Sequence, residues 1–556
     1  MLRLFWLQIV QHQHYVQLAN VEQLKRERIP ATRGEIYALS SGSPVKIVMN
    51  ETVYTVFVDP SILTDTQEVV RVMKDIAGGN VRENFEELLE KKDTRYQIIA
   101  TRVTRHQADK IKEKQLSGIG FQAISQRVYP EGKLASQLLG FVNAEGVGNY
   151  GVEGYLNEEL SGTDGRLETV TDVSDVPLTI GDRNVRQAAV DGTDVVLSVD
   201  RSIQAKVEEA LVAASERTGA SDVSAVVMNP NSGKILAMAN VPTYDPAQYY
   251  NVSDAALFNN KVITYPYEPG SVIKTYTMAT AADKNVAGPN DTFNNTDYIV
   301  VDDRTITNAT KGKTGVISFQ TALNWSLNTG FVTIAKRLGD GNSINLTARQ
   351  TMYEYFHDRL RLGQLTGVEL SGEQAGIIIS PDDPDGNAVR YSNMSFGQGL
   401  NATMIQVASG FSAIINGGNY YTPTVLAGKM VNGNFVANST PKPAYAGVIS
   451  SSTSATLRTM THEARISSFP TIDRPGYFVG GKTSTAQVIE DGKYSENESI
   501  GTYLGYGGGS ADSPEYVIMV SISGKGKQMQ GARDALPIFT EISNWMLDYL
   551  KIQPKG

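Results

Sequence analysis

The sequence predicts an α/β protein in which one large α/β domain begins near residue 195. The composition is that of an ordinary globular chain, with 556 residues of which 41% are hydrophobic and 51 are glycine. After residue 195 the secondary-structure signals follow the order strands, helices, strands and a terminal helix. That order is typical of one large α/β domain.

The elements of this domain follow from local patterns. Residues 192–200 predict a strand, and residues 203–218 show the apolar spacing of an amphipathic helix. Residues 224–240 predict a hairpin, because two apolar runs flank the turn sequence Asn-Pro-Asn-Ser-Gly. The later segments are expected to be mainly helical at 271–356, extended at 476–489 and 515–524, and helical again at 537–550.

Residues 31–194 show a mixed pattern and are expected to form a separate N-terminal domain. Short β-rich runs alternate with helical stretches, and glycine turns punctuate the region between residues 140 and 154. The expected strands lie at 52–58 and 167–171, and the expected helices at 64–76, 84–92 and 108–116.

Residues 1–30 are expected to form a stalk next to a membrane. The first ten residues are apolar and include Phe5 and Trp6, whereas residues 11–28 are polar and compatible with a helix. Two interpretations of the apolar start remain open: a buried N-terminal helix, or the interfacial end of a membrane anchor with Trp6 at headgroup level. No run of 18 apolar residues occurs, so a complete membrane span is not expected in this sequence.

Charge and cysteine content exclude several classes of function. The net charge is −9 and no cluster of five or six basic residues occurs, which argues against binding to nucleic acid. The absence of cysteine excludes disulfides, zinc–thiolate sites and a cysteine nucleophile. The five histidines are too scattered to indicate a metal site, and no cofactor is expected. The chemistry must therefore use hydroxyls, carboxylates or lysines.

A serine and a lysine at helical spacing form the first candidate motif. In Pro269-Gly270-Ser271-Val-Ile-Lys274 the proline and glycine end a loop, and Lys274 lies one helical turn after Ser271. A desolvated amine beside a serine hydroxyl can activate it as a nucleophile. About two S-x-x-K matches are expected by chance in such a chain. Ser43-Pro-Val-Lys46 also matches, but it lies in a loop before a strand, so Ser271 is the better candidate.

The second candidate motif is S-x-N. Ser326-Leu-Asn328 lies between the apolar helical segments 319–325 and 329–338 and should be held rigidly. Two other matches, Ser343-Ile-Asn345 and Ser495-Glu-Asn497, lie in a polar turn and a charged loop.

The third candidate motif is the strand Gly480-Gly-Lys482-Thr483-Ser484-Thr485-Ala486, whose small residues would let a ligand backbone lie against it. A competing Lys313-Thr-Gly315 is better explained as a turn before the short run 316–319. S-x-x-K, S-x-N and Lys-Thr-small in this order form the serine acyl-transferase set of penicillin-binding proteins and β-lactamases.

With these motifs the chain resembles the class B penicillin-binding proteins, the monofunctional peptidoglycan transpeptidases, over nearly its whole length. Further segments carry the resemblance: Arg33-Gly-Glu-Ile-Tyr37, Gly151-Val-Glu-Gly154, 228–238, Tyr267-Glu-Pro-Gly-Ser271, Phe396-Gly-Gln-Gly399 and 480–487. The resemblance implies a short membrane anchor, an elongated mixed α/β pedestal over 31–194, and a transpeptidase domain over 195–556. It implies that this last domain is an antiparallel sheet flanked by helices, on the extracytoplasmic side of a bacterial cell membrane.

The resemblance also implies an activity and roles for single residues. Ser271 would attack the penultimate D-Ala carbonyl of a stem peptide, with Lys274 as base, and β-lactams would acylate it covalently. Ser326 would relay the proton and Asn328 would bind the donor amide. Lys482 and Thr483 would hold the terminal carboxylate, and the backbone N–H groups of Ser271 and Thr485 would form the oxyanion hole. A membrane-embedded glycan-strand polymerase would be the partner.

Other functions remain to be separated from this one. A class A β-lactamase would need an E-x-x-N after its second motif, and none occurs between residues 328 and 482. A D,D-carboxypeptidase, and a catalytically weak scaffold or β-lactam sensor, remain open.

One residue departs from the family pattern in the third motif. The usual Lys-Thr-Gly is here Lys482-Thr483-Ser484. Side chains alternate along a strand, so Ser484 should share a face with Lys482 and point into the substrate groove. Either a small residue is tolerated there, or the hydroxyl narrows the groove and slows acylation by bulky β-lactams.

Overall fold

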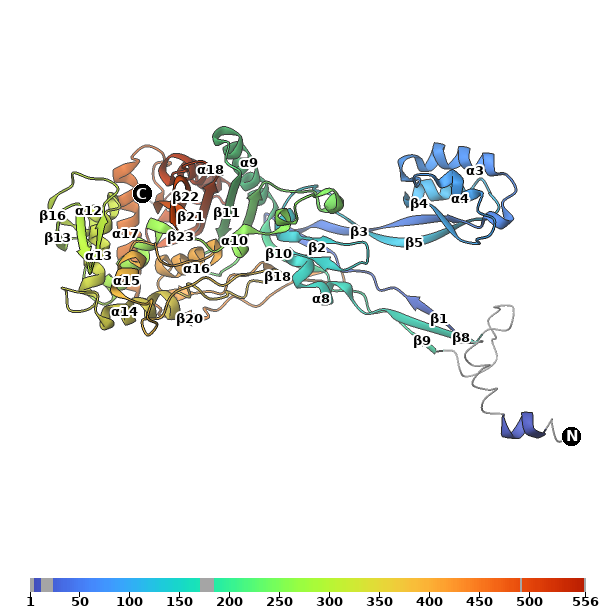
Figure 1. Ribbon diagram of the computed structural model, residues 1–556, viewed down its shortest axis with the longest axis horizontal. Coiled ribbons are helices and arrows are strands. Elements are labelled where there is room, and N and C mark those ends of the chain that lie inside the picture. Colours follow the sequence, from blue (N-terminus) through green and yellow to red (C-terminus); the bar gives the residue numbers. More distant parts are fainter. Residues whose placement is uncertain (1–4, 12–23, 171–184, 491–492, 555–556) are drawn as a thin grey trace. The chain divides into compact units, whose positions relative to one another are not determined.

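The computed structural model describes residues 5–11, 24–170, 185–490 and 493–554 (Figure 1). Two compact units are present. Unit 1 comprises Met1–Ile36, Lys46–Pro130 and Glu158–Asp194, and unit 2 comprises Tyr37–Val45, Glu131–Asn157 and Val195–Gly556. Both units are therefore discontinuous in sequence. The linear division expected at residues 194 and 195 misses two earlier segments that pack with the later part.

Unit 1 contains an antiparallel sheet covered by short helices. Strand β3 (Ser43–Val58) pairs with both β4 (Gln97–Thr104) and β5 (Ile119–Val128). The covering helices are α3 (Thr66–Val72), α4 (Phe85–Leu89) and α5 (Arg105–Lys112). Apolar residues of these helices and strands form one buried cluster, which explains the alternating strand and helix patterns of this region.

A second, three-stranded sheet of unit 1 corrects part of the expected stalk helix. Strand β1 (Leu24–Ile29) pairs with β8 (Gly165–Val170), which pairs with β9 (Val185–Gln187). The last residues of the expected helix 11–28 are thus extended, and residues 12–23 lie outside the described part.

The apolar start contains a short helical turn, η1 (Trp6–Val10). Trp6, Ile9 and Val10 of this turn and the preceding Phe5 are exposed rather than buried. Within the described ranges, no helix has the length and apolar character needed to cross a membrane.

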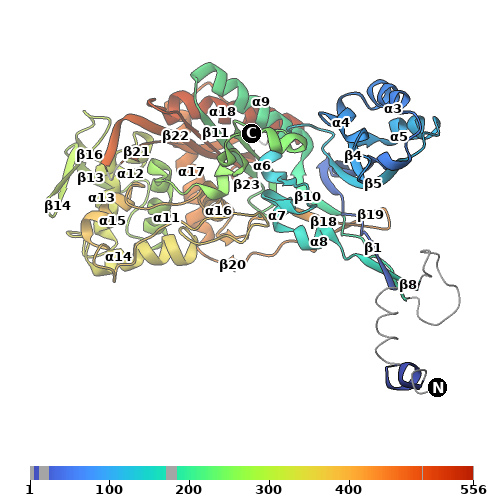
Figure 2. The same cartoon turned by 45° about the vertical axis from the view of Figure 1, so that its right-hand side comes forward.

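The centre of unit 2 is a five-stranded antiparallel sheet of order β12-β11-β23-β22-β21. Its strands are β11 (Asp222–Met228), β12 (Ile235–Val241), β21 (Phe478–Glu490), β22 (Lys493–Ser510) and β23 (Ser513–Ser523). On one face, helices α9 (Arg201–Thr218) and α18 (Leu536–Tyr549) pack against the sheet through a continuous apolar core (Figure 2). The fold is the expected antiparallel sheet flanked by helices.

The other face of the sheet carries the helices that build the candidate site. They include α10 (Lys261–Thr264), α11 (Lys274–Asp283), α16 (Met404–Ile415) and α17 (Ser451–Ser468). Further helices lie between α11 and α16 in the chain: α12 (Phe319–Asn324), α13 (Asn328–Arg337), α14 (Leu346–Tyr353) and α15 (Ala388–Met394).

Unit 2 has further strands apart from the five-stranded sheet. Two small two-stranded sheets interrupt the expected helical region, formed by β13 (Thr292–Asn295) with β16 (Gly315–Ser318) and by β14 (Tyr298–Val301) with β15 (Arg304–Thr307). Outside the five-stranded sheet, strand β18 (Leu426–Val431) pairs with both β10 (Val195–Asp200) and β19 (Asn434–Ala437).

Candidate active site

A tight turn places Ser271 at the start of α11. Residues Gly270–Ile273 form the 3-10 turn η7, which runs directly into the helix. Gly270 has φ +62° and donates its N–H to Gly397 O at 3.0 Å. A Cβ on Gly397 would lie 1.9 Å from Gly270 O, so the close approach of these two backbones requires glycine. The turn is therefore fixed on both sides before Ser271.

Lys274 is the centre of the site. Its side chain is fully buried, and its Nζ lies 3.0 Å from Ser271 Oγ. The same nitrogen lies 3.0 Å from Ser326 Oγ, 2.7 Å from Ser326 O and 2.8 Å from Asn328 Oδ1. The structure thus brings together four of the five residues expected to be catalytic. One amine contacts the hydroxyls of both candidate serines.

Ser326 lies in the short connection between α12 and α13. Its φ of +56° is unusual for a residue other than glycine, and it turns both the carbonyl and the hydroxyl towards Lys274. The connection is held by two amide side chains, since Asn328 Nδ2 donates to Thr307 O at 3.0 Å and the buried Asn308 Oδ1 accepts from Thr329 N at 3.0 Å. The hairpin that contains Thr307 and Asn308 therefore supports the S-x-N motif.

Strand β21 forms the edge of the sheet and carries Lys482. Residues 482, 484 and 486 are buried, whereas residues 485 and 487 on the opposite face are exposed. Lys482 Nζ donates to Thr483 O at 2.9 Å and lies 3.4 Å from Thr483 Oγ1. Thr485 faces the other way, and its Oγ1 accepts the Gly531 N–H at 3.2 Å.

Ser484 shares a face with Lys482, and its side chain is buried like that of Lys482. It is only 2% exposed, and its Oγ accepts the backbone N–H of Ser271 at 2.8 Å. Whether Ser484 is a tolerated small residue or slows acylation by bulky β-lactams stays a prediction. The hydroxyl lies beneath the nucleophile, because strand β21 packs directly on turn η7.

Burial controls the charges of both lysines. Desolvation lowers the pKa of Lys274 well below its ordinary value, and the positive charge of Lys482 lowers it further. Desolvation also lowers the pKa of Lys482, to about 7. Within the described ranges neither amine has a carboxylate in ion-pair contact. The site therefore favours a neutral Lys274 and is prepared to bind an anion beside Lys482.

Sequence reasoning did not single out Glu268, which precedes Pro269 and is 92% buried. Its Oε1 accepts the Gly399 N–H at 2.7 Å and lies 3.3 Å from Tyr494 Oη. Burial raises the pKa of Glu268, although these hydrogen bonds oppose the shift. A cavity of about 660 Å³ lies beside it and is lined by both acidic and basic side chains, among them Arg390. The signal in the sequence was the position of this acid, three residues before the serine.

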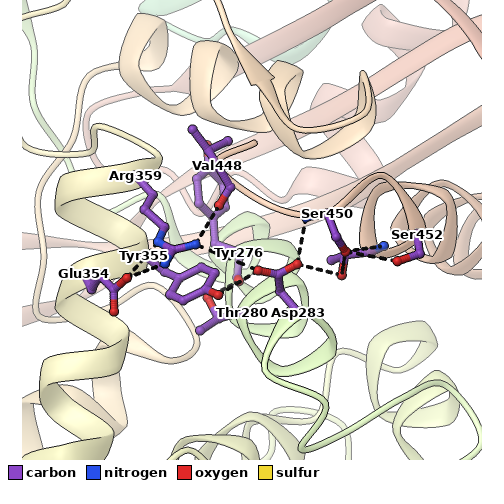
Figure 3. A network of polar contacts seen from close by, with 10 residues as sticks. Tyr276, Thr280, Asp283, Glu354, Tyr355, Arg359, Val448, Ser450 and Ser452 are labelled. Carbon is purple, nitrogen blue, oxygen red and sulfur yellow. Dashed lines mark hydrogen bonds and ion pairs between the residues drawn. The ribbon is translucent and has the colours of Figure 1, made fainter. Parts of the chain in front are cut away.

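The far end of α11 is also fixed by polar contacts (Figure 3). Asp283 Oδ1 accepts the Ser450 N–H at 2.7 Å, and Tyr355 Oη donates to Asp283 Oδ2 at 2.7 Å. Thr453 Oγ1 donates to the same carboxylate at 3.0 Å. Helix α11 is therefore anchored at both ends, and these contacts fix the positions of Ser271 and Lys274 relative to each other.

The competing S-x-x-K match lies elsewhere and has the wrong geometry. Ser43 and Lys46 lie in strand β3, where residues three apart point to opposite faces. Lys46 forms an ion pair with Glu35 at 2.8 Å.

The competing matches to the other two motifs also have structural roles. Ser343 contacts Asp340 in an exposed turn, and Asn345 caps α14. Ser495 lies in strand β22. Lys313 lies over the ring of Trp325 at 3.9 Å from its centroid, ahead of strand β16.

Comparison with known proteins agrees with this fold and this site. Residues 223–544 match the penicillin-binding protein transpeptidase domain, and residues 28–197 match the penicillin-binding protein dimerisation domain. The chain therefore belongs to the penicillin-binding protein transpeptidases, and its two-domain organisation is that of the class B proteins.

Several members of the family are similar to the whole chain. Stage V sporulation protein D of Bacillus subtilis is 30% identical over 100% of this chain and 84% of its own length. Peptidoglycan D,D-transpeptidase FtsI of Buchnera aphidicola is 26% identical over 100% of this chain and 93% of its own length. A crystal structure of penicillin-binding protein 3 of Mycobacterium tuberculosis in complex with aztreonam superposes with a TM-score of 0.70 at 25% identity. The matched region covers 95% of this chain and 98% of the chain in that crystal structure.

Proposed function

We propose that this protein is a peptidoglycan D,D-transpeptidase that cross-links stem peptides through an acyl-enzyme on Ser271. The observation that carries the proposal is the contact of one buried amine, Lys274 Nζ, with the hydroxyls of Ser271 and Ser326. A lysine whose pKa is lowered by burial can accept the serine proton at neutral pH. The family and its relatives support the same reaction class.

The first half of the reaction forms the acyl-enzyme. Ser271 Oγ bonds to the carbonyl carbon of the penultimate D-Ala, while Lys274 takes the hydroxyl proton. The amide C–N bond then breaks, and the nitrogen of the departing D-Ala takes a proton from Ser326 Oγ, which is replaced by the proton that Lys274 holds. In the second half, the amine of a neighbouring stem bonds to the ester carbonyl carbon and the bond from that carbon to Ser271 Oγ breaks. The proton that the amine loses returns through Lys274 to Ser271 Oγ.

Lys482 and Thr483 are proposed to bind the terminal carboxylate of the donor. A buried lysine with a pKa of about 7 and no carboxylate partner in the described structure gains a proton and an ion pair when a carboxylate enters. The Lys482 and Thr483 side chains lie 3.4 Å apart and can contact the two oxygens of one carboxylate. Asn328 Nδ2 donates to Thr307 O, and Asn328 Oδ1 accepts from Lys274 Nζ. Asn328 Oδ1 can therefore orient the donor amide only after its hydrogen bond with Lys274 breaks.

The serine assignment is tested by mass spectrometry of the intact protein after β-lactam treatment, with the modified peptide mapped. We expect one adduct on Ser271 and none in Ser271→Ala, since only a hydroxyl is lost. Ser343→Ala removes a serine of a competing motif and should label normally. An adduct that persists in Ser271→Ala, on Ser43 or any other serine, contradicts the assignment.

Covalent labelling does not distinguish a transpeptidase from a D,D-carboxypeptidase or a β-lactam sensor. Turnover of a lipid-linked donor with an acceptor does. A transpeptidase releases D-Ala and forms a cross-linked product, whereas a carboxypeptidase releases D-Ala without cross-linking. Labelling without either product identifies a sensor or scaffold.

We further propose that the protein works at the outer face of a bacterial cell membrane, beside a membrane-embedded glycan-strand polymerase. The dimerisation-domain match over residues 28–197 and the exposed apolar residues of η1 support this placement. The polymerase is expected to contact unit 1.

A further inference from the structure

The backbone N–H of Ser271 already has an acceptor inside the protein. This N–H belongs to the first turn of η7, where backbone donors have no acceptor within the helix. Ser484 Oγ accepts it at 2.8 Å. In the proposed reaction the same N–H would stabilise the negative oxygen that forms when Ser271 attacks. The hydroxyl therefore occupies one donor of the oxyanion hole.

The position of Ser484 is fixed by its surroundings. It is 2% exposed, and an added Cβ on Gly270 would lie 2.3 Å from Ser484 Oγ and 3.3 Å from Ala486 Cβ. On the other side, an added Cβ on Gly531 would lie 2.2 Å from Ser484 O. Two glycines thus allow strand β21 to pack this closely. The serine side chain fills the space against the nucleophile turn.

Among the described residues the Ser484 hydroxyl makes one hydrogen bond, so no second hydrogen bond opposes its displacement from the Ser271 N–H. Within the described part of the chain, Ser484 Oγ accepts from Ser271 N, and no acceptor for the hydroxyl hydrogen is present. A serine at this depth is held at its oxygen alone. Rotation about χ1 moves Oγ away from the Ser271 N–H without breaking a second hydrogen bond.

We propose that Ser484 is a positioning residue that keeps the Ser271 N–H occupied in the resting enzyme, so that an incoming carbonyl oxygen must displace the Ser484 hydroxyl. This inference rests on the proposed acyl transfer at Ser271. The competition acts on the oxygen that becomes negative in the transition state. It therefore lowers the rate of acylation at saturation and leaves the binding of the intact ligand unchanged.

Competition predicts a different outcome from two other roles for this side chain. A steric role of Cβ would change ligand binding and would depend on ligand size. A hydroxyl that rotates to donate to the oxyanion would speed acylation, so its loss would slow the reaction. Removing Oγ and Cβ separately distinguishes all three.

The experiment compares Ser484→Ala and Ser484→Gly with the wild type. A fluorescent penicillin and a bulky cephalosporin are used, and the saturating acylation rate and the apparent dissociation constant are measured separately. We expect Ser484→Ala to raise the saturating rate about 2- to 10-fold for both ligands, which corresponds to releasing one ordinary hydrogen bond. Ser484→Gly should give the same gain, and both dissociation constants should stay unchanged.

A matched control comes from the neighbouring strand. Ser499 is 6% exposed and its Oγ donates to Met529 O at 2.8 Å, so Ser499→Ala also loses a buried hydroxyl but does not contact Ser271. Its acylation rate should equal that of the wild type.

Three results overturn the inference. They are a lower saturating acylation rate in Ser484→Ala, a higher saturating rate in Ser484→Gly but not in Ser484→Ala, or a change in the apparent dissociation constant of either ligand in either variant. If Ser484→Ala fails to fold, Ser484→Gly is measured with both ligands: an equal gain in rate with unchanged dissociation constants supports the inference, whereas a gain that depends on ligand size overturns it. Normal labelling of Ser271 with no effect of Ser484→Ala or Ser484→Gly refutes this inference only, whereas labelling at another serine refutes the proposed function itself.

Discussion

Two buried lysines share the candidate site, and their different surroundings give them different tasks. Lys274 contacts three oxygen groups of two serines and Asn328 Oδ1, so it can exchange protons with the reacting hydroxyls. Lys482 has only Thr483 as a partner in the described structure, so it keeps its hydrogen-bonding capacity for an anion. Burial lowers the pKa of Lys274 and the charge of Lys482 lowers it further, so the protonation state of Lys482 affects the supply of a neutral base.

This link predicts a shift in the pH profile of acylation. Lys482, with a pKa of about 7, is charged below neutral pH and then disfavours a proton on Lys274. In Lys482→Met this repulsion is lost and the pKa of Lys274 rises. The pH below which acylation declines should therefore move upward, as measured by penicillin acylation rates between pH 5 and 9 or so.

Lys482→Arg is the control for this prediction, because it keeps a positive charge and should leave the acidic limb near its wild-type position. An acidic limb that stays in place in Lys482→Met would show that Lys274 does not titrate under the influence of residue 482.

At the scale of elements, helix α11 depends on contacts at both of its ends. Gly270 and Gly397 fix the first turn, and Asp283 fixes the last by accepting hydrogen bonds from Ser450, Tyr355 and Thr453. Burial raises the pKa of Asp283, but these hydrogen bonds outweigh it and lower the pKa below its ordinary value of about 3.8. The ionised carboxylate is therefore the form that stabilises the fold.

Asp283→Asn should destabilise unit 2 by about 1–3 kcal/mol at pH 7, since a buried charged acceptor is lost. A group whose pKa is lowered by folding stabilises the fold above its unfolded pKa and loses this effect as pH falls through its folded pKa. The difference between variant and wild type should thus shrink below about pH 4, measured by urea unfolding. Asp303→Asn, at an exposed turn, should have no effect at either pH. An equal loss at pH 7 and pH 3 would show that the charge of Asp283 is not what matters.

The elements with a strong local pattern are the ones that the sequence predicts. Helix α9 and the β11–β12 hairpin lie where the apolar spacing and the Asn-Pro-Asn-Ser-Gly turn place them. The strands β13 to β16 were not expected, because four residues are too few to establish a period. Strand β22 was also missed, since both of its faces are buried over most of its length and it shows no alternation.

The candidate site could also be predicted only as far as local sequence patterns determine it. Context ranked Ser271 above Ser43, and the structure gathers Ser271, Lys274, Ser326 and Asn328 as the motif order requires. The contact of Ser484 with the Ser271 N–H depends on how closely strand β21 packs on Gly270. No local pattern contains that distance.

At the scale of the whole molecule, the core of unit 2 includes residues from the N-terminal part of the chain. Phe141 stacks on Tyr249 with ring centroids 4.3 Å apart and lies 4.8 Å from Phe258. Gln137 Nε2 donates to Pro242 O at 2.9 Å. These contacts make the segment Glu131–Asn157 part of the domain that carries Ser271.

Phe141→Ala should therefore destabilise the active-site unit by about 3–5 kcal/mol, the usual loss for a buried phenylalanine. The measurement is penicillin labelling of Ser271 as a function of urea, which reports unit 2 alone. Phe121→Ala removes an aromatic partner of Tyr54 in unit 1 and should leave the labelling midpoint unchanged. Equal midpoints for Phe141→Ala and the wild type would contradict the assignment of this segment.

The proposed partner is also tested on the whole molecule. Expressed with a membrane anchor, the protein should co-purify with a glycan-strand polymerase, and substitutions over the exposed surface of unit 1 should abolish this while penicillin labelling stays normal. If association survives these substitutions, the polymerase does not bind through unit 1.

The interrupted course of unit 2 along the chain has a consequence for how the protein is made. Residues 37–45 and 131–157 leave the ribosome before any of the residues after Val195 with which they pack. Unit 1, whose last segment ends at Asp194, has all of its residues available earlier and can fold first. The early segments of unit 2 cannot pack until later residues are synthesised, because Phe141 has no contact with Tyr249 and Phe258 before then. We expect slow translation between residues 157 and 258 to increase the demand for chaperones, and nascent chains halted there to bind penicillin only after synthesis resumes.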